Sequence, residues 1–209
     1  SRKIRLSGVV GPRRHGNEQP LEMMFRVRIH GRGGQGVVTA AELLSMAAFF
    51  ENKHAQAFPS FGSERMGAPV VSYCRIDDSE IRLREPINSP NALIIQDPTL
   101  LLSVDVFHGL ERDGFILINS QRSFEELGIA EFVAKFPPGH VCNVGATDLA
   151  LKHVGRPLPN AALLGGFAAI SDEIRLASVE KAIHQKFAGE IGQANAAAAR
   201  EAFETLKTA

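Results

Sequence analysis

The sequence predicts an α/β fold: a Rossmann-like, mostly parallel sheet flanked by helices, in a single domain. Three observations lead to this class. Strand-like apolar runs alternate with helical patterns, a glycine-rich turn joins the first strand to the first helix, and no linker divides the chain. A length of 209 residues with 44% hydrophobic content also suits one soluble domain with a substantial core.

The first strand is predicted over residues 25–30, where Phe25, Val27 and Ile29 alternate with basic side chains. The segment before it carries a cluster of bases and is expected to form a basic N-terminal arm, residues 1–24, ahead of the domain at 25–209. A helix follows the glycine turn over residues 37–50, because alanines and leucines recur there at helical spacing.

The remaining elements follow from the same periodicities. Strands are predicted at residues 69–76, 92–96, 115–119 and 140–144. Helices are predicted at residues 103–112, 146–154, 160–169, 178–187 and 192–207. The last helix carries a stripe of small residues suited to close helix packing. The alternation of the two kinds of element predicts parallel strands joined by right-handed crossovers.

The glycine-rich turn is the first candidate site. Gly31, Gly33 and Gly36 have the spacing of a dinucleotide-binding fingerprint, in which glycines let the backbone turn sharply and present N–H groups at a helix N-terminus. An acidic residue about 20 residues later should follow a second strand. Glu51 is at that distance but no strand pattern precedes it, so NAD binding is disfavoured. The turn is either a tight structural connection or a phosphate site formed by Gly31, Arg32, Gly33, Gly34, Gln35 and Gly36.

A second motif covers residues 58–69 and feeds directly into a predicted strand. Its glycines, prolines and aromatic residues around an adjacent Glu and Arg indicate a structured loop. Two interpretations stay open. The aromatic side chains cover the sheet edge beside a local ion pair, or the loop packs against another subunit through Phe58, Phe61, Glu64 and Arg65.

Composition excludes several kinds of partner. Lys and Arg total 23 against 23 Asp and Glu, so no overall field attracts nucleic acid or an acidic membrane surface. No apolar stretch reaches the roughly 20 residues that a membrane span requires. Cys74 and Cys142 form no CxxC motif, so no disulfide framework or metal site is predicted. We expect a cytoplasmic protein whose two thiols, and His30 bonded to nearby backbone, are structural.

The two motifs together resemble the gamma subunit of 2-oxoacid:acceptor oxidoreductases, the pyruvate:ferredoxin oxidoreductase family. The resemblance is carried by GRGGQG at residues 31–36 and PSFGSERMGAP at residues 59–69. It continues through residues 75–78, 81–84, 95–101, 146–150, 157–160 and 164–166. It covers roughly residues 25–187 and leaves the basic arm outside.

The resemblance implies a multi-subunit complex that converts a 2-oxoacid and coenzyme A (CoA) to an acyl-CoA and CO₂, passing electrons to ferredoxin or NAD. Thiamine diphosphate, Mg²⁺ and [4Fe–4S] clusters are then expected on thiamine-binding alpha and beta chains and a ferredoxin-like delta chain, since two cysteines cannot hold a cluster. This chain would not be catalytic alone. It would assemble the complex and help to hold a CoA phosphate at the glycine turn, although Glu42 stands where relatives carry a lysine.

Two other functions stay open at this stage. The chain could be a self-sufficient Rossmann-type nucleotide-binding oxidoreductase, which predicts saturable binding of NAD or FAD by the isolated protein. It could also be a purely structural scaffold of the same complex, with no ligand at the glycine turn. The 2-oxoacid and the electron acceptor are not specified by the sequence.

Overall fold

A computed structural model describes residues 24–60 and 65–208, and these form a six-stranded sheet in the order β2-β3-β1-β4-β5-β6. The strands are β1 (Phe25–Arg32), β2 (His54–Pro59), β3 (Pro69–Asp77), β4 (Ala92–Ile95), β5 (Phe115–Asn119) and β6 (Val141–Val144). β1, β4, β5 and β6 run parallel, whereas β3 is antiparallel to both β1 and β2. The predicted α/β class with a mostly parallel sheet is confirmed, and an antiparallel pair extends it at one edge.

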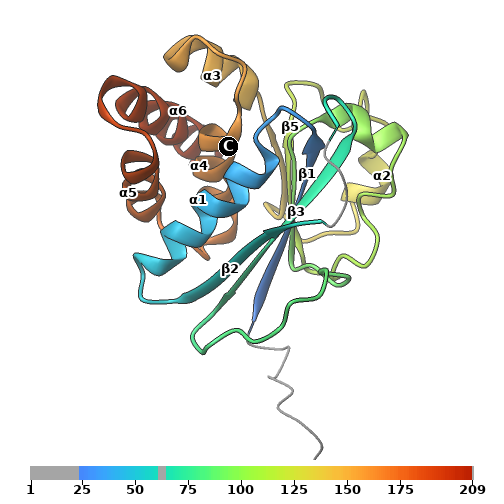
Figure 1. Ribbon diagram of the computed structural model, residues 1–209. Coiled ribbons are helices and arrows are strands. Elements are labelled where there is room, and N and C mark those ends of the chain that lie inside the picture. The colour runs from blue at the N-terminus through green and yellow to red at the C-terminus, as the bar shows by residue number, and fades with distance from the viewer. Residues whose placement is uncertain (1–23, 61–64, 209) are drawn as a thin grey trace, which may run out of the picture.

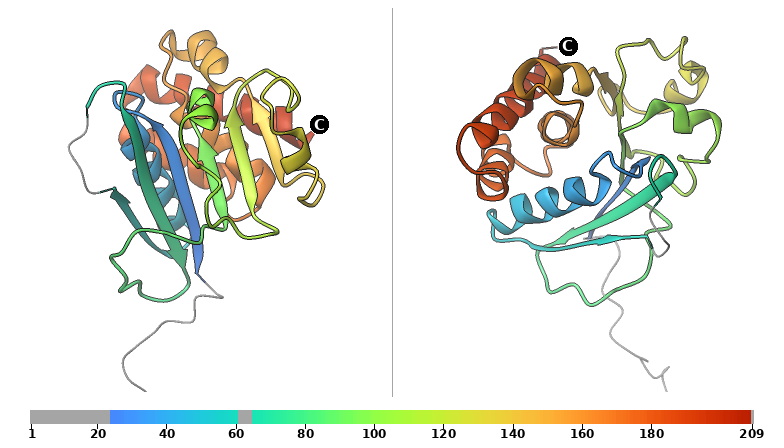
Figure 2. Two further views of the ribbon diagram at one scale, coloured as in Figure 1. Left: turned by 90° about the vertical axis from the view of Figure 1, so that its right-hand side faces the viewer. Right: turned by 45° about the horizontal axis from the view of Figure 1, so that its top comes forward.

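Helices cover the two faces of the sheet unequally (Figure 1). The five longer helices lie on one side, as the turned views also show (Figure 2). They are α1 (Val37–Phe49), α3 (Ala146–Val154), α4 (Asn160–Ser171), α5 (Leu176–Lys186) and α6 (Gly189–Lys207). The other side carries the short α2 (Ala130–Val133), the 3₁₀ helix η1 (Pro98–Leu102) and long loops.

The helical side is built around α4, which is buried along most of its length. A side chain at Gly165 would overlap the carbonyl group of Ala199, so α4 and α6 approach at a distance that only glycine allows. Ala196, Ala198 and Ala202 of α6 are buried as well. The small residues of the last helix therefore serve packing within the chain.

Each face of the sheet has its own hydrophobic core. Val27, Ile29 and Ile94 point into the larger core, beneath α1 and α4. Leu93 and Ile116 belong to the smaller core on the opposite face, under η1 and α2. Because β4 and β5 are buried on both sides, they read as nearly continuous apolar runs in the sequence, as parallel strands do, whereas β1 alternates apolar and basic residues.

The predicted helix at residues 103–112 is wrong. The segment continues from η1 as a series of turns, and Gly109 has a positive φ of 72°. The buried guanidinium of Arg28 donates hydrogen bonds to the carbonyl oxygens of Val106 (2.8 Å) and His108 (2.7 Å). These bonds hold the backbone in a non-helical path, which a periodicity count does not reveal.

Three elements were not expected from the sequence: the 3₁₀ helix η1, β2 and α2. β2 is an edge strand that pairs on one side only, has a mostly half-buried surface and ends at Pro59, so it lacks the apolar alternation of a core strand. α2 is a single turn with no fully buried residue. The predicted basic arm at residues 1–24 lies outside the described residues except for Met24, which is 2% exposed.

Candidate functional site

The sheet reverses its strand order between β1 and β4. After β1 the chain passes to β2 and β3 on one side and then returns to β4 on the other. In open α/β sheets, the crevice outside the carboxyl ends of strands at such a switch point is the usual ligand site. The glycine turn follows β1 at this place and leads into α1 (Figure 1). We call this region, residues 31–36, 65–68, 96–102 and Asn160, the carboxyl edge.

The glycines of the turn are required by close contacts within the protein. A side chain at Gly33 would overlap the backbone carbonyl of Arg65, and one at Gly36 would overlap the Asn160 amide. Gly36 also has a φ of 73°, in the left-handed region that favours glycine. A side chain at Gly31 would meet Val37 at 2.5 Å. The dinucleotide-like spacing is therefore explained here by internal packing.

The two sequence motifs meet at this edge. The Gly33 N–H donates to the Ala68 carbonyl (2.9 Å), and the Gly67 N–H donates to the Gly33 carbonyl (3.0 Å). Next to these bonds Arg65 is exposed and Met66 is 86% exposed. The sequence singled out both motifs without predicting that they pair.

The other residues predicted for a subunit contact are placed differently. Phe58 is half-buried, with its ring 5.0 Å from the Tyr73 ring and 5.2 Å from the Arg75 guanidinium carbon. Phe61 and Glu64 lie outside the described residues. Of the predicted contact residues that the structure describes, Arg65 is exposed, and so is its neighbour Met66.

Arg32 is the centre of a polar network at the carboxyl edge. Its Nε lies 3.2 Å from the Asp97 carboxylate, and its Nη2 donates to the Thr99 hydroxyl at 2.9 Å. Gln35 donates to the same carboxylate at 2.8 Å and accepts from the Arg32 N–H at 2.7 Å. Burial tends to raise the pKa of Asp97, but hydrogen bonds from Thr99 and Gln35 and the charge of Arg32 outweigh it, so the pKa lies below its ordinary value. The carboxylate is held ionised.

The first turn of α1 begins without a side-chain cap, since Gly36 is the N-cap, and no acidic residue occupies that turn. The N–H groups of residues 37–39 and the helix dipole therefore make the carboxyl edge electropositive at the start of α1. Glu42 does not oppose this, because its carboxylate pairs with Lys186 on α5 at 2.9 Å. Glu51 lies beyond the opposite end of α1 and accepts from the Arg175 N–H, so it cannot serve as a ribose acceptor near the turn.

Polar residues that were not predicted as site residues complete the edge. The Gln96 amide donates to Asn160 Oδ1 at 3.0 Å, and Asn119 donates to the Gln96 carbonyl at 2.9 Å and to Thr147 at 2.8 Å. Gln96 Oε1 is buried with no hydrogen-bond partner among the described residues. The available signal was the polar residue that ends an otherwise apolar strand, at Gln96 after β4 and Asn119 at the end of β5.

His30 and the two cysteines are structural groups. His30 is 4% exposed, and its Nε2 accepts from Arg28 Nε at 3.0 Å, so its partner is a side chain and not the backbone that we expected. Burial, together with the Arg28 charge, lowers the pKa of His30 to about 3. Burial raises the pKa of Cys74 to about 12 and also raises that of Cys142. Neither thiol is a poised nucleophile or metal ligand.

The described residues contain no group of three or more His, Cys, Asp or Glu side chains that could hold a metal ion. Nor do they include a helix with the length and apolar character needed to cross a membrane.

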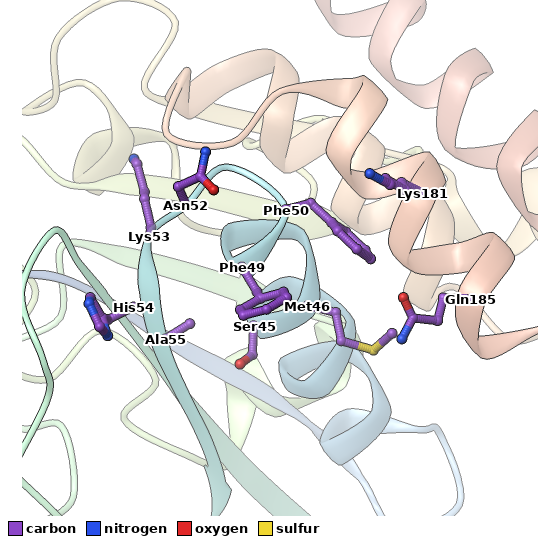
Figure 3. Close-up of a pocket in the computed structure, with 10 residues that line it drawn as sticks. All are labelled: Ser45, Met46, Phe49, Phe50, Asn52, Lys53, His54, Ala55, Lys181 and Gln185. Carbon is purple, nitrogen blue, oxygen red and sulfur yellow. The ribbon is translucent and has the colours of Figure 1, made fainter.

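A hollow lies at the C-terminal end of α1 (Figure 3). It has a volume of about 740 Å³ and is lined from the end of α1, the start of β2 and α5. Phe49 is 72% exposed there, and the Lys181 ammonium lies 4.6 Å from the centre of the Phe50 ring. No acidic side chain lines it. No sequence motif was identified at this position.

Comparison with known proteins relates the chain to one family. Residues 26–205 match the family described as pyruvate ferredoxin/flavodoxin oxidoreductase. The chain is 48% identical over 181 residues to the pyruvate/ketoisovalerate oxidoreductases common subunit gamma of Pyrococcus abyssi, covering 87% of this chain and 96% of that protein. It is 44% identical to the pyruvate synthase subunit PorC of Methanocaldococcus jannaschii, covering 88% and 97%. The crystal structure of the pyruvate oxidoreductase subunit PORC of Thermotoga maritima superposes with a TM-score of 0.73 at 34% identity, covering 87% and 96%.

Proposed function

The chain belongs to the pyruvate ferredoxin/flavodoxin oxidoreductase family, and we propose that it is the gamma subunit of a complex that oxidatively decarboxylates a 2-oxoacid to an acyl-CoA and CO₂. The two curated relatives named above match along 96% and 97% of their length, so the likeness extends over nearly the whole of each. The redox and thiamine chemistry would then belong to partner chains: thiamine-binding alpha and beta chains and a ferredoxin-like delta chain. Ferredoxin or NAD would accept the electrons.

The surface beside the glycine turn supports a role in assembly. Met66 and Leu102 are 86% and 88% exposed, and they come from two segments that Arg32 ties together through Gly67 and Thr99. Large apolar side chains on a fixed polar framework are typical of protein contacts. We place a contact with a partner subunit at Arg65, Met66 and Leu102.

We also propose that the carboxyl edge contacts CoA. The observation that carries it is the uncapped first turn of α1 at the switch point of the sheet, next to the half-buried Arg32. Backbone N–H groups and the helix dipole at this position favour a phosphate group, and Arg32 would supply a positive charge. Since Glu42 is engaged by Lys186, it does not repel such a group.

A scaffold without ligand at the turn is the second candidate, and a specific observation favours it. The spaces beside Gly33 and Gly36 are filled by Arg65 and Asn160, and the Arg32 guanidinium is already paired with Asp97. A phosphate would have to share Arg32 with that carboxylate. The two candidates agree on assembly and differ only in the CoA contact.

The experiment uses the assembled complex carrying Arg32→Gln, with Arg200→Gln as a matched control. Arg200 also forms an ion pair, with Glu180, but it lies on α6 away from the carboxyl edge. If Arg32 contacts a CoA phosphate, the KM for CoA rises about tenfold while the KM for the 2-oxoacid is unchanged, because a charge-assisted contact is lost. A complex that assembles with both KM values unchanged would eliminate the CoA contact and leave the scaffold.

Assembly itself is tested separately by purifying the complex through a tag on this chain and identifying the partners that accompany it. Thiamine-binding and iron-containing chains in fixed ratio support the gamma-subunit function. If the chain purifies without them from cells that make all subunits, the function as proposed is wrong, whatever the effect of Arg32→Gln.

A further inference from the structure

α2 lies on the opposite side of the sheet from α1 (Figure 1), and residues of α2 and of the loops next to it line a separate cleft. It has a volume of about 350 Å³ and is formed between the loop at residues 103–112 and the segment of α2. Six side chains line it: Phe107, Leu110, Arg112, Phe132, Lys135 and Phe136. Neither the sequence motifs nor the proposed function involves these residues.

The floor of the cleft is aromatic. The Phe107 and Phe132 rings are 4.3 Å apart between centroids, and the Phe132 and Phe136 rings are 5.2 Å apart. All three rings are half-buried and pack on the smaller core, so they are fixed from beneath while part of their surface faces outward. Such a surface binds hydrocarbon or aromatic groups.

The rim of the cleft is cationic. Arg112 and Lys135 are exposed, and neither forms an ion pair within residues 24–60 and 65–208. No acidic side chain lines the cleft. Two carboxylates flank Arg112 in sequence: Glu111 is bonded to Arg26 at 3.2 Å, and Asp113 is exposed. The side chains of Arg112 and Lys135 therefore lie beside an apolar floor, and no ion pair among the described residues neutralises them.

The loop that forms one wall is held in place from inside the protein. Arg28, which is 7% exposed, donates to the Val106 and His108 carbonyl oxygens. At Gly109 a side chain would overlap the Asn88 carbonyl, so the loop lies directly against the neighbouring segment. A wall fixed in this way preserves the cleft in the absence of a ligand, which lowers the entropic cost of binding.

We propose that this cleft binds an organic carboxylate with an apolar tail, the tail against the Phe107, Phe132 and Phe136 rings and the carboxylate between Arg112 and Lys135. A pocket with an apolar floor and a few convergent charged groups recognises this class of molecule. The site is on the opposite face of the sheet from α1 and is independent of the gamma-subunit function. Carboxylates with hydrocarbon side chains, 2-oxoacids among them, fall in the class.

The test compares 4-phenylbutyrate with 4-phenylbutan-1-ol on the full chain by isothermal titration calorimetry. The two molecules share the tail and differ in the charged group. The carboxylate should bind about tenfold more tightly than the alcohol, since the cationic rim acts only on the anion. Amide NMR shifts on adding the carboxylate should be largest at residues 107–112 and 132–136. Equal affinity for the two molecules, or shifts centred elsewhere, would overturn the proposal.

Two double variants locate the binding. Arg112→Gln with Lys135→Gln removes the rim charges from exposed positions, so the fold is retained, and the affinity for 4-phenylbutyrate should fall to that of the alcohol. The matched control is Arg156→Gln with Lys181→Gln, which removes one arginine and one lysine charge from exposed positions elsewhere. Lys181 lines the hollow beside Phe49, which also combines basic and apolar side chains. The control should bind as the original chain does. If the control loses the affinity instead, the ligand binds in the hollow beside Phe49 and the proposed site is refuted.

Discussion

The two ends of α1 are built in opposite ways. At its N-terminal end, protein atoms occupy the space beside Gly33 and Gly36, and Arg32, Gln35, Asp97 and Thr99 satisfy one another. At its C-terminal end, Phe49 is 72% exposed over a hollow of about 740 Å³ (Figure 3). The end with a recognisable motif is closed, and the end without one is open.

This difference shows what a glycine motif guarantees. Glycines are required wherever backbone must approach closely, and the approaching group can be a phosphate or another part of the same chain. Here the residues that approach are Arg65 and Asn160. The free polar groups that a ligand could use are the N–H groups at the start of α1, which the motif positions but does not identify.

Gly33→Ala should produce the largest effect, because it attacks the closed end directly. Its Cβ would overlap a backbone carbonyl that cannot rotate away, so the free energy of unfolding should fall by about 3 kcal/mol in urea denaturation. The control is Gly67→Ala, a glycine in the same contact with a φ of 77° and no atom within 4 Å of the added Cβ. It should cost about 1 kcal/mol, from backbone strain alone. Equal losses would mean that the turn is not closely packed.

Acid should weaken the closed end through His30, whose pKa falls from an ordinary 6.5 to about 3 on folding. The unfolded chain binds a proton below pH 6.5 that the folded chain excludes, so the stability contributed by neutral His30 is complete above that pH and is lost as the pH falls toward 3. Between pH 6.5 and 5 the loss should be about 2 kcal/mol. In His30→Gln this part of the pH dependence of unfolding should disappear. An unchanged slope in the variant would show that another group causes it.

Asp97→Asn should have a smaller effect at the same end. The amide keeps the shape but loses the charge that Arg32, Gln35 and Thr99 address, so thermal and urea unfolding should show a loss of about 1–2 kcal/mol. Asp172→Asn is the comparison, since Asp172 also pairs with a base, Lys207, but its side chain is 82% exposed. It should change stability by less than about 0.5 kcal/mol. If the two variants lose the same free energy of unfolding, the network around Arg32 does not stabilise the carboxyl edge.

Phe49→Ser should have the smallest effect on the chain, within about 0.5 kcal/mol of the original free energy of unfolding, because the ring is mostly in solvent. The same urea experiment measures it. A loss above about 1 kcal/mol would show that the open end is packed in solution, and the contrast between the two ends of α1 would fail.

The sequence predicted the parts of the fold that depend on local pattern. The helices at residues 37–50 and 146–154 and the strands at 92–96 and 115–119 agree with the structure to within one residue, because their side chains repeat with a helical or strand period over a buried surface. The loop at residues 103–112 failed because Arg28, about 80 residues away in sequence, takes its carbonyl oxygens. β2 was missed because an edge strand needs little apolar patterning.

The candidate site was predictable in position but not in detail. The glycines located the switch point, since a strand, a glycine turn and a helix must stand at the carboxyl edge of a parallel sheet. Gln96, Asp97 and Asn160 were not predicted as site residues, although they lie in segments that carry the family resemblance. Each is an ordinary polar residue until the fold brings it close to Arg32 or Gly36. The hollow beside Phe49 depends on what the fold leaves unfilled, which no residue pattern records.

Reconstitution tests whether this chain is the gamma subunit of a 2-oxoacid oxidoreductase complex. The partner chains are purified with and without this chain, and the 2-oxoacid- and CoA-dependent reduction of the acceptor is measured. We expect the isolated chain to contain no iron and to have no activity, and we expect its addition to the partner chains to restore turnover that they lack alone. Full turnover without this chain, or turnover by this chain by itself, would contradict the claim.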